Sequence, residues 1–316
     1  MPTTGDFFYL DPTSVPAGTK PWSKVDGPFR SFTLTPRRRS VTNIRDVLSP
    51  TNPSPPTPGF ATNIDIAGFA LHDSPAAEKT FTSQETVRTG YYAEVEALLR
   101  AKLPGKIARV EIFDHTIRKH DPESPRQPVQ QVHVDQTPAA AAARVRRHVK
   151  DGEAEGLLKK RFQLINVWRP IGHAAEDFPL AVVDWRTTKG GDLVPVDLMY
   201  PLHHRTPGGD DDDRGKEALP DVEKGLSTEG YEVKGETYGV VEGEEPGRHR
   251  FYYVKDMTPE EVLFIKCFDS WGQGKEGGRE GVAALTPHTA FVDPQTPVGV
   301  KGRESIEVRC LVFYEE

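Results

Sequence analysis

The alternation of apolar and polar residues predicts a chain built mostly of β-strands. Short apolar or alternating segments recur from residue 107 to the C-terminus, and turn-forming residues separate them. Short strands at such spacing are typical of a β-sandwich or a β-barrel. The expected strands are 107–112, 131–135, 162–168, 180–185, 193–198, 231–241, 251–254, 289–292 and 306–313. We therefore expect a mainly β fold.

Three segments carry helix signals instead. Residues 91–103 place apolar side chains three and four positions apart, behind a capping-box pattern. A threonine followed by a proline opens each of the other two segments, as is typical of the N-cap and first turn of a helix. We expect these helices over residues 91–103, 138–148 and 260–268.

Two parts of the chain stand outside this pattern. Residues 1–80 are rich in Pro, Thr and Ser, and we expect them to form an N-terminal extension ahead of one domain over residues 81–316. A polar insertion is expected near residues 203–250, where Asp210 to Asp213 form a run of carboxylates. Calcium binding is the alternative for this run, but the spacing of an EF-hand loop is missing, so we interpret it as a solvated loop.

Composition limits the partners of this domain. The chain has 316 residues, 36% of them hydrophobic, which is enough for a substantial core. A net charge of -7 gives no basic field for nucleic acid or an anionic membrane. The N-terminus lacks a signal-peptide pattern, and no run of about 18 apolar residues is present. We expect a soluble, cytoplasmic protein that acts on a small molecule, and composition does not indicate its oligomeric state.

The two cysteines do not predict a disulfide or a zinc site. Cys267 and Cys310 lie far apart in apolar runs, where a free thiol behaves as a small core residue. Without paired cysteines, a structural zinc site made of thiolates is excluded. Any metal would have to be held by histidine and carboxylate side chains.

A histidine and an aspartate share one face of the strand expected at 131–135. His133 and Asp135 are two residues apart, so their side chains converge on one point. One more histidine from elsewhere would complete the facial triad that binds Fe(II) and leaves three coordination positions open. The candidates for this third ligand are His203, His204, His249 and His288.

The residues after His288 distinguish it from the other candidates. A short strand and a turn-rich segment follow it, and Arg303 and Ser305 then open the last strand. Two residues apart on a strand, they face the same way, so the guanidinium can bind a carboxylate and the hydroxyl can add a hydrogen bond. The sequence therefore predicts a site for a dicarboxylate together with a metal site.

The order of these motifs resembles that of the Fe(II)- and 2-oxoglutarate-dependent oxygenases, whose catalytic core is a double-stranded β-helix, or jelly roll. Over residues 80–316 the chain is similar to the fungal gibberellin-desaturase-like and cephalosporin 7α-methoxylase-related branch. The similar segments are HVDQT at 133–137, NVWRP at 166–170, PLAVVD at 179–184, FDSW at 268–271, HTAF at 288–291 and RESIEVR at 303–309. The resemblance implies a jelly-roll oxygenase domain over residues 81–316, with flanking α-helices.

The resemblance also implies a metal site and a cosubstrate site. The predicted ligands of Fe(II) are His133, Asp135 and His288, and the predicted partners of the distal carboxylate of 2-oxoglutarate are Arg303 and Ser305. Arg303 follows His288 by 15 residues (303 minus 288), a longer spacing than is usual in the superfamily. Arg309 is therefore the alternative anchor.

Four further residues are implied near the reaction. Asn166 is expected to contact the cosubstrate from a neighbouring strand. Trp168, Arg169 and Trp185 are candidates for the substrate pocket, although both tryptophans also suit a hydrophobic core and Arg169 also suits an ion pair at a sheet edge. Arg169 and Arg186 favour an anionic substrate.

The implied reaction couples decarboxylation of 2-oxoglutarate to oxidation of a C–H bond in a small molecule of secondary metabolism. Hydroxylation, desaturation and ring closure are all compatible with these motifs. One alternative is a divalent-metal hydrolase or isomerase, in which the same triad would activate water, but such an enzyme needs no dicarboxylate. The other is a non-catalytic binding module, which needs no intact set of ligands.

Overall fold

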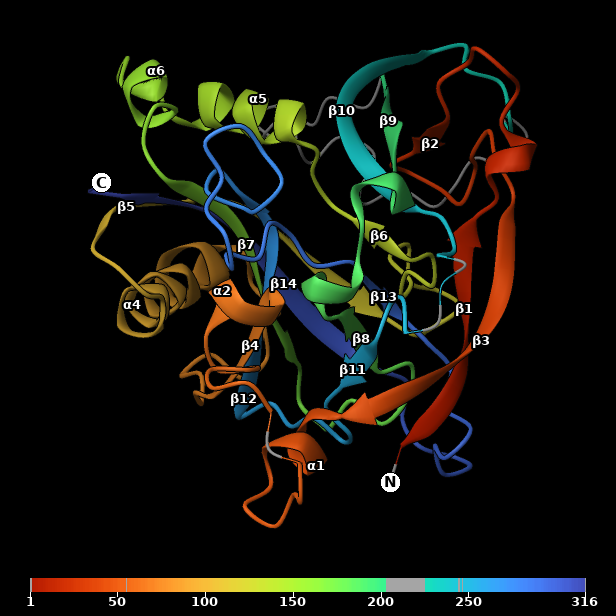
Figure 1. The fold of residues 1–316 in the computed structure, drawn as a ribbon, viewed down its shortest axis with the longest axis vertical. Helices are drawn as coiled ribbons and strands as arrows, with labels where there is room; N and C mark the ends of the chain where they lie inside the picture. Colours follow the sequence, from red (N-terminus) through yellow and green to blue (C-terminus); the bar gives the residue numbers. More distant parts are fainter. Residues whose placement is uncertain (1, 55, 203–224, 244, 246, 316) are drawn as a thin grey trace.

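Two β-sheets of unequal size form the fold, in a computed structural model that describes residues 2–54, 56–202, 225–243, 245 and 247–315 (Figure 1). The larger sheet has nine strands in the order β1-β3-β11-β8-β13-β6-β10-β9-β2, and the smaller sheet has five in the order β4-β12-β7-β14-β5. The prediction of a mainly β fold is confirmed.

The strands of the smaller sheet are longer on average, and all of their pairings are antiparallel. This sheet consists of β4 (Phe69–Asp73), β5 (Ile107–Lys119), β7 (Phe162–Pro170), β12 (Glu261–Asp269) and β14 (Glu304–Tyr314). The larger sheet consists of β1 (Thr3–Leu10), β2 (Trp22–Lys24), β3 (Leu34–Asn43), β6 (His133–Val134), β8 (Leu180–Val183), β9 (Leu193–Pro201), β10 (Tyr231–Val240), β11 (Phe251–Tyr253) and β13 (His288–Ala290).

The helices are short and lie outside the sheets. They are α1 (Ile44–Leu48), α2 (Ile64–Ala67), α3 (Gln84–Thr86), α4 (Tyr92–Lys102), α5 (Pro138–His148) and α6 (Ala154–Leu157), with single turns at η1 (Pro12–Ser14), η2 (Val87–Tyr91), η3 (Trp185–Thr187) and η4 (Gly190–Asp192). Two of the predicted helices are confirmed as α4 and α5, and the Thr137 hydroxyl caps α5 by accepting from the Ala140 amide at 3.2 Å. In the described part of the chain, no helix is long and apolar enough to cross a membrane.

The helix predicted over residues 260–268 is wrong, because this segment forms β12. All nine residues of the strand are buried, since it lies between β4 and β7 in the middle of the smaller sheet. Thr258 accepts a backbone hydrogen bond from Glu261 and so makes a turn rather than a helix cap. A short apolar run does not distinguish a buried strand from a buried helix.

Residues 1–80, predicted as an extension, contribute strands to both sheets. β1 and β3 continue the larger sheet beyond β11, β2 lies at its other edge, and β4 is an edge strand of the smaller sheet. The predicted carboxylate run Asp210 to Asp213 lies outside the described residues, as do His203 and His204. The described part of the predicted insertion includes β10, which pairs with β9 and β6.

Alternate residues of β14 face opposite sides of the smaller sheet. Ile306, Val308 and Cys310 of β14 pack with α4 in a buried cluster outside the sheet, and Figure 1 shows α4 beside this sheet. The alternate residues face the larger sheet, because Arg309 reaches Asp135 there. Both cysteines are buried and free. The space between the sheets therefore receives the polar side chains of β14.

A buried ion network anchors the loop that follows β12. The Lys266 ammonium lies 2.5 Å from Asp65, 2.7 Å from Asp269 and 3.0 Å from the Ala283 carbonyl oxygen. Burial alone would raise the pKa of Asp269, but Lys266 and Arg161 outweigh burial and lower it to about 2. The network thus holds both ends of the loop 270–283 against the smaller sheet.

Candidate metal centre

The three predicted metal ligands lie together between the sheets. His133 on β6 and His288 on β13 are directly opposite each other in register, and Asp135 follows β6. The Oδ1 atom of Asp135 lies 3.4 Å from Nε2 of His133 and 3.8 Å from Nε2 of His288. All three ligand atoms lie within 4.8 Å of one another, and no other group of this kind occurs among the residues that the structure describes. Two imidazoles and one carboxylate on one side of a point match the facial triad of Fe(II).

Backbone carbonyl groups orient both imidazole rings. Nδ1 of His133 lies 2.7 Å from the Gln131 carbonyl oxygen, and Nδ1 of His288 lies 3.1 Å from that of Thr286. A carbonyl oxygen only accepts, so Nδ1–H donates in each case and the lone pair of Nε2 faces the triad. Burial, together with His133, lowers the pKa of His288 and favours the neutral imidazole that binds metals.

Two side chains of the smaller sheet hold the other oxygen of Asp135. Oδ2 accepts from Nδ2 of Asn166 at 2.7 Å and from Nε of Arg309 at 3.2 Å, and these two residues are opposite each other on β7 and β14. Burial alone would raise the pKa of Asp135, but Arg309 and both histidines hold it well below its usual value. The carboxylate is therefore ionised, and Oδ1 is left to bind a metal.

Arg303 is a buried cation that lacks an anion. Only 2% of the residue is exposed, its Nη1 donates to the Phe178 carbonyl oxygen, and its Nε has no partner. Among the described residues, no carboxylate oxygen lies within 4.0 Å of the Arg303 guanidinium, the distance limit for an ion pair. Burial lowers the pKa of Arg303 to about 9. Such a group is stabilised when an anion binds to it.

The Arg303 guanidinium lies beside Trp168 of β7. Its central carbon lies 5.6 Å from the ring centroid of Trp168. Trp168 is two residues after Asn166 on the same face of β7, in the layer next to the triad. Ser305 is buried two residues after Arg303 on β14. The arrangement suits one carboxylate at Arg303 and a second donor group at the metal, as 2-oxoglutarate provides.

Arg309, the alternative anchor, is already occupied by carboxylates. Besides Asp135, its guanidinium donates to Asp114 at 2.9 Å, to Glu307 at 2.7 Å and to the Thr116 hydroxyl at 3.0 Å. These contacts assign it to holding Asp135, and they favour Arg303 as the cosubstrate anchor. Asn166, predicted to contact the cosubstrate, also donates to Asp135, although its Oδ1 has no partner.

The remaining histidine candidate and two of the substrate candidates lie elsewhere. His249 is buried against Asp192 and Tyr9, at 3.0 and 3.2 Å. Trp168 packs in a core cluster between the sheets. Arg169 is on the opposite face of β7, where Nε donates to the Tyr91 hydroxyl at 2.7 Å, so its contacts are structural rather than directed at a substrate.

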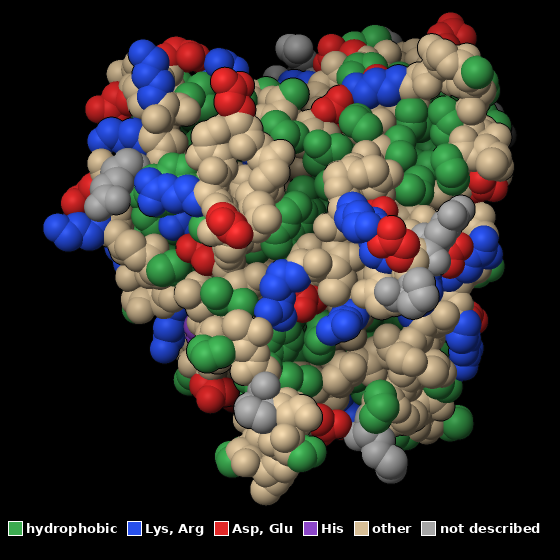
Figure 2. Space-filling view, viewed as in Figure 1, with side chains coloured by type: hydrophobic (Ala, Val, Ile, Leu, Met, Phe, Trp, Pro, Cys, Tyr) green, Lys and Arg blue, Asp and Glu red, His purple; other side chains and the backbone are tan. Residues whose placement is uncertain are grey.

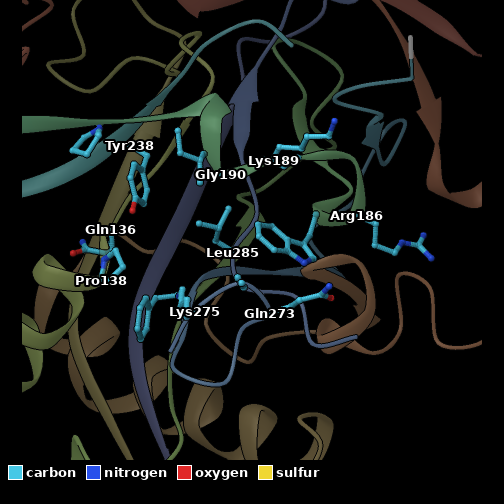
Figure 3. Close-up of a pocket in the computed structure, with 16 residues that line it drawn as sticks. Gln136, Pro138, Arg186, Lys189, Gly190, Tyr238, Gln273, Lys275 and Leu285 are labelled. Atoms are coloured by element: carbon cyan, nitrogen blue, oxygen red, sulfur yellow. The ribbon is translucent and has the colours of Figure 1, made fainter. Parts of the chain in front are cut away.

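Trp185 lines a cavity of about 710 Å³, whose lining residues are drawn in Figure 3. None of the three metal ligands lines the cavity. Two of its lining residues are close to ligands in the sequence, because Gln136 directly follows Asp135 and Leu285 comes three residues before His288. Figure 2 shows hydrophobic side chains in a recess near the centre of the face in view, among mixed acidic and basic side chains. Lys275 also lines the cavity, and its loop position carried no sequence signal for this role.

Asn166→Ala is expected to weaken Fe(II) binding roughly 10- to 100-fold, because Asp135 loses a hydrogen bond that orients it. The Fe(II) dissociation constant is measured without oxygen by competition with a chelator. Gln163→Ala is the matched control, since Gln163 is a buried amide of β7 that bonds to Asp65 and Asp269 instead. Equal affinities of Asn166→Ala and the wild type would contradict this role.

Comparisons with known proteins agree with this geometry. A family model described as an oxidoreductase/YMDC permease-like domain matches residues 23–313. Hydroxylase/desaturase poxK of Penicillium oxalicum is 31% identical over 322 aligned residues, which cover 100% of this chain and 88% of poxK. The Fe(II)/2-oxoglutarate-dependent dioxygenase nvfI of Aspergillus novofumigatus is 33% identical over 72% of this chain and 71% of nvfI.

The fold is also similar to a solved structure of the iron and alpha-ketoglutarate-dependent endoperoxidase NvfI. The TM-score is 0.71 at 23% identity, covering 99% of this chain and 97% of NvfI. The matches confirm the fungal oxygenase family that the HVD and RES motifs predicted. The chain belongs to the oxidoreductase family of the fungal hydroxylase/desaturases and Fe(II)/2-oxoglutarate-dependent dioxygenases.

Proposed function

We propose that this chain is a non-haem Fe(II)/2-oxoglutarate oxygenase that oxidises a small molecule of secondary metabolism. The observation that carries the proposal is that His133, Asp135 and His288 converge between the two sheets. The same two sheets bury Arg303, which has no carboxylate partner. A divalent-metal hydrolase would use the same triad, but it would leave Arg303 uncompensated. Membership of the family supports the oxygenase.

Each residue of the site has a task in this proposal. His133, Asp135 and His288 hold Fe(II), and Arg303 with Ser305 binds the distal carboxylate of 2-oxoglutarate. When bound, Fe(II) and 2-oxoglutarate supply the O2-dependent oxidation of a C–H bond. The chain positions the reactants and keeps bulk water away, because the site lies between two packed sheets. Hydroxylation, desaturation and ring closure all fit this arrangement.

Hydrogen bonds with neighbouring groups orient all three ligands of the triad. Carbonyl groups of Gln131 and Thr286 set the ring orientations, while Asn166 and Arg309 hold Asp135. Such contacts to ligands tune metal affinity and geometry.

The strand order supports a double-stranded β-helix. From β5 to β8 the chain alternates between the smaller and the larger sheet, and from β11 to β14 it alternates again. The hairpin of β9 and β10 lies between these two halves and widens the larger sheet. This order favours a jelly roll made of four strands in each sheet, β11-β8-β13-β6 and β12-β7-β14-β5.

Turnover of 2-oxoglutarate tests this function without a known substrate. With Fe(II) and oxygen, the wild type is expected to convert 2-oxoglutarate slowly to succinate and to consume O2 in step. His288→Ala should lose this activity, while His249→Ala, which alters a buried histidine outside the site, should keep it. If succinate formation does not depend on Fe(II), or if it persists in His288→Ala, the proposal fails.

A further inference from the structure

The cavity that Trp185 lines has apolar walls and no acidic side chain. Its volume of about 710 Å³ is in the range of cavities that bind small molecules. Aromatic and aliphatic groups dominate the lining, and no Asp or Glu is among the lining residues. The main apolar contributors are Trp185, Leu193, Tyr238, Phe268 and Leu285. A bound molecule would therefore meet apolar surface on most sides.

Two of the three cations at the cavity are already paired with carboxylates. Arg186 lies 2.7 Å from Asp184, and Figure 3 shows its side chain extending away from the other labelled residues. Lys189 lies 2.5 Å from Glu245. Both cations already have a carboxylate partner. The contacts of Arg186 therefore do not support the prediction that it favours an anionic substrate.

Lys275 is the cation of the cavity without a carboxylate. Its ammonium donates to the Asp269 carbonyl oxygen at 3.0 Å and lies 3.7 Å from the ring centroid of Phe268. Among the described residues, no carboxylate oxygen is within 4.0 Å of it. A carbonyl and a ring face attract an ammonium group but do not neutralise it. Burial lowers the pKa of Lys275 to about 7, as expected for an uncompensated ammonium.

The position of Lys275 is fixed by the core. It lies in the loop whose two ends the Lys266 network holds, and its partner Asp269 belongs to that network. In Figure 3 it lies below Leu285, on the side of the cavity away from Lys189 and Gly190. The ammonium is thus presented on a supported loop, which suits recognition of a ligand group.

We propose that this cavity binds a small molecule with an apolar body and an anionic group such as a carboxylate, and that Lys275 binds the anionic group. The inference rests on the proposed function in that it treats the cavity as the substrate site. The apolar walls contact the body of the molecule, and Lys275 selects acids over neutral analogues of the same shape.

Matched probes test this selectivity without turnover. Binding of 2-naphthoate and 2-naphthamide is measured by calorimetry at pH 7, without oxygen, in the presence of Fe(II) and saturating 2-oxoglutarate that occupies its own site. The wild type should bind the acid roughly tenfold more tightly than the amide, the effect of one partly buried ion pair. Lys275→Met should remove the preference, and Lys275→Arg should keep it.

Lys189→Met is the matched control, because Lys189 lines the same cavity but is paired with Glu245. It should keep the preference for the acid. The proposal is overturned if the wild type binds neither probe, binds both equally, or keeps its preference in Lys275→Met. It is also overturned if Lys189→Met loses the preference to the same extent.

Failure of this inference can be told apart from failure of the oxygenase proposal. In His133→Ala the iron-dependent formation of succinate should disappear, while the preference for 2-naphthoate should persist because Lys275 does not contact the triad. Thermal unfolding of Lys275→Met should match the wild type, since only one carbonyl hydrogen bond and one ring contact are lost. A wild type without turnover that still prefers the acid would refute only the oxygenase.

Discussion

Asp135→Ala is expected to lower the affinity for Fe(II) by more than about 100-fold and to abolish turnover of 2-oxoglutarate. Changes to groups that merely orient a ligand already cost about 10- to 100-fold in metal affinity, so loss of the ligand itself should cost more. Asp135 also supplies the only negative charge of the triad. The dissociation constant of Fe(II), measured without oxygen, gives the size of the effect.

The fold should survive this substitution. Arg309 keeps its contacts with Asp114 and Glu307, so no cation is left without a partner. Asp192→Ala is the matched control, because Asp192 is a buried aspartate that pairs with Arg248 and His249 outside the site. The control should lose stability but retain iron. If Asp135→Ala bound Fe(II) as tightly as Asp192→Ala, the triad would be assigned wrongly.

Arg303→Met is expected to weaken the binding of 2-oxoglutarate by at least about 30-fold, because truncating a buried charge pair costs about 2–5 kcal/mol. Affinity for Fe(II) alone should not change, since Arg303 does not contact the ligands. Calorimetry without oxygen, in the presence of Fe(II), measures the dissociation constant of 2-oxoglutarate. Methionine keeps the apolar part of the side chain while it removes the charge.

The substitution that weakens 2-oxoglutarate binding should not destabilise the protein in the absence of 2-oxoglutarate. Arg303 has a folded-state pKa of about 9, below its ordinary value of 12.5, so its burial opposes folding at neutral pH. Without 2-oxoglutarate, Arg303→Met should therefore be at least as stable as the wild type. On addition of 2-oxoglutarate, the melting temperature should rise for the wild type and not for the variant.

Arg169→Met is the matched control for this experiment. Arg169 is equally buried, but it bonds to Tyr91 and to backbone carbonyls on the other face of β7. This variant should be less stable and should still respond to 2-oxoglutarate. If 2-oxoglutarate raised the melting temperature of Arg303→Met as much as that of the wild type, another residue would have to bind the distal carboxylate.

Local spacing was enough to predict much of the site. His133 and Asp135 are two residues apart at the end of β6, and Arg303 and Ser305 are two residues apart at the start of β14. The period of two residues expected of a strand was therefore enough to pair them. The same period explains why Arg169 lies away from the proposed site. Asn166 and Trp168 face the space between the sheets, so Arg169 faces the other side, where it meets Tyr91 of η2.

Other features depended on contacts between distant segments. The preference for Arg303 over Arg309 as the proposed anchor rests on the contacts of Arg309 with Asp114, Glu307 and Asp135. These three carboxylates come from different strands or loops. Lys275 lies in a loop, and its place depends on the distant Lys266 network rather than on any local pattern. The apolar run of β12 carried no signal that separates a central strand from a buried helix.

The visible spectrum of the protein with Fe(II) and 2-oxoglutarate, recorded without oxygen, shows whether both bind at the proposed metal centre. We expect a weak charge-transfer band from 2-oxoglutarate chelated to iron in the wild type, and its loss in His133→Ala and Asp135→Ala. The band should persist in Asp192→Ala. Absence of the band in the wild type, or an undiminished band in either triad variant, would contradict the assignment of this site as an iron and 2-oxoglutarate centre.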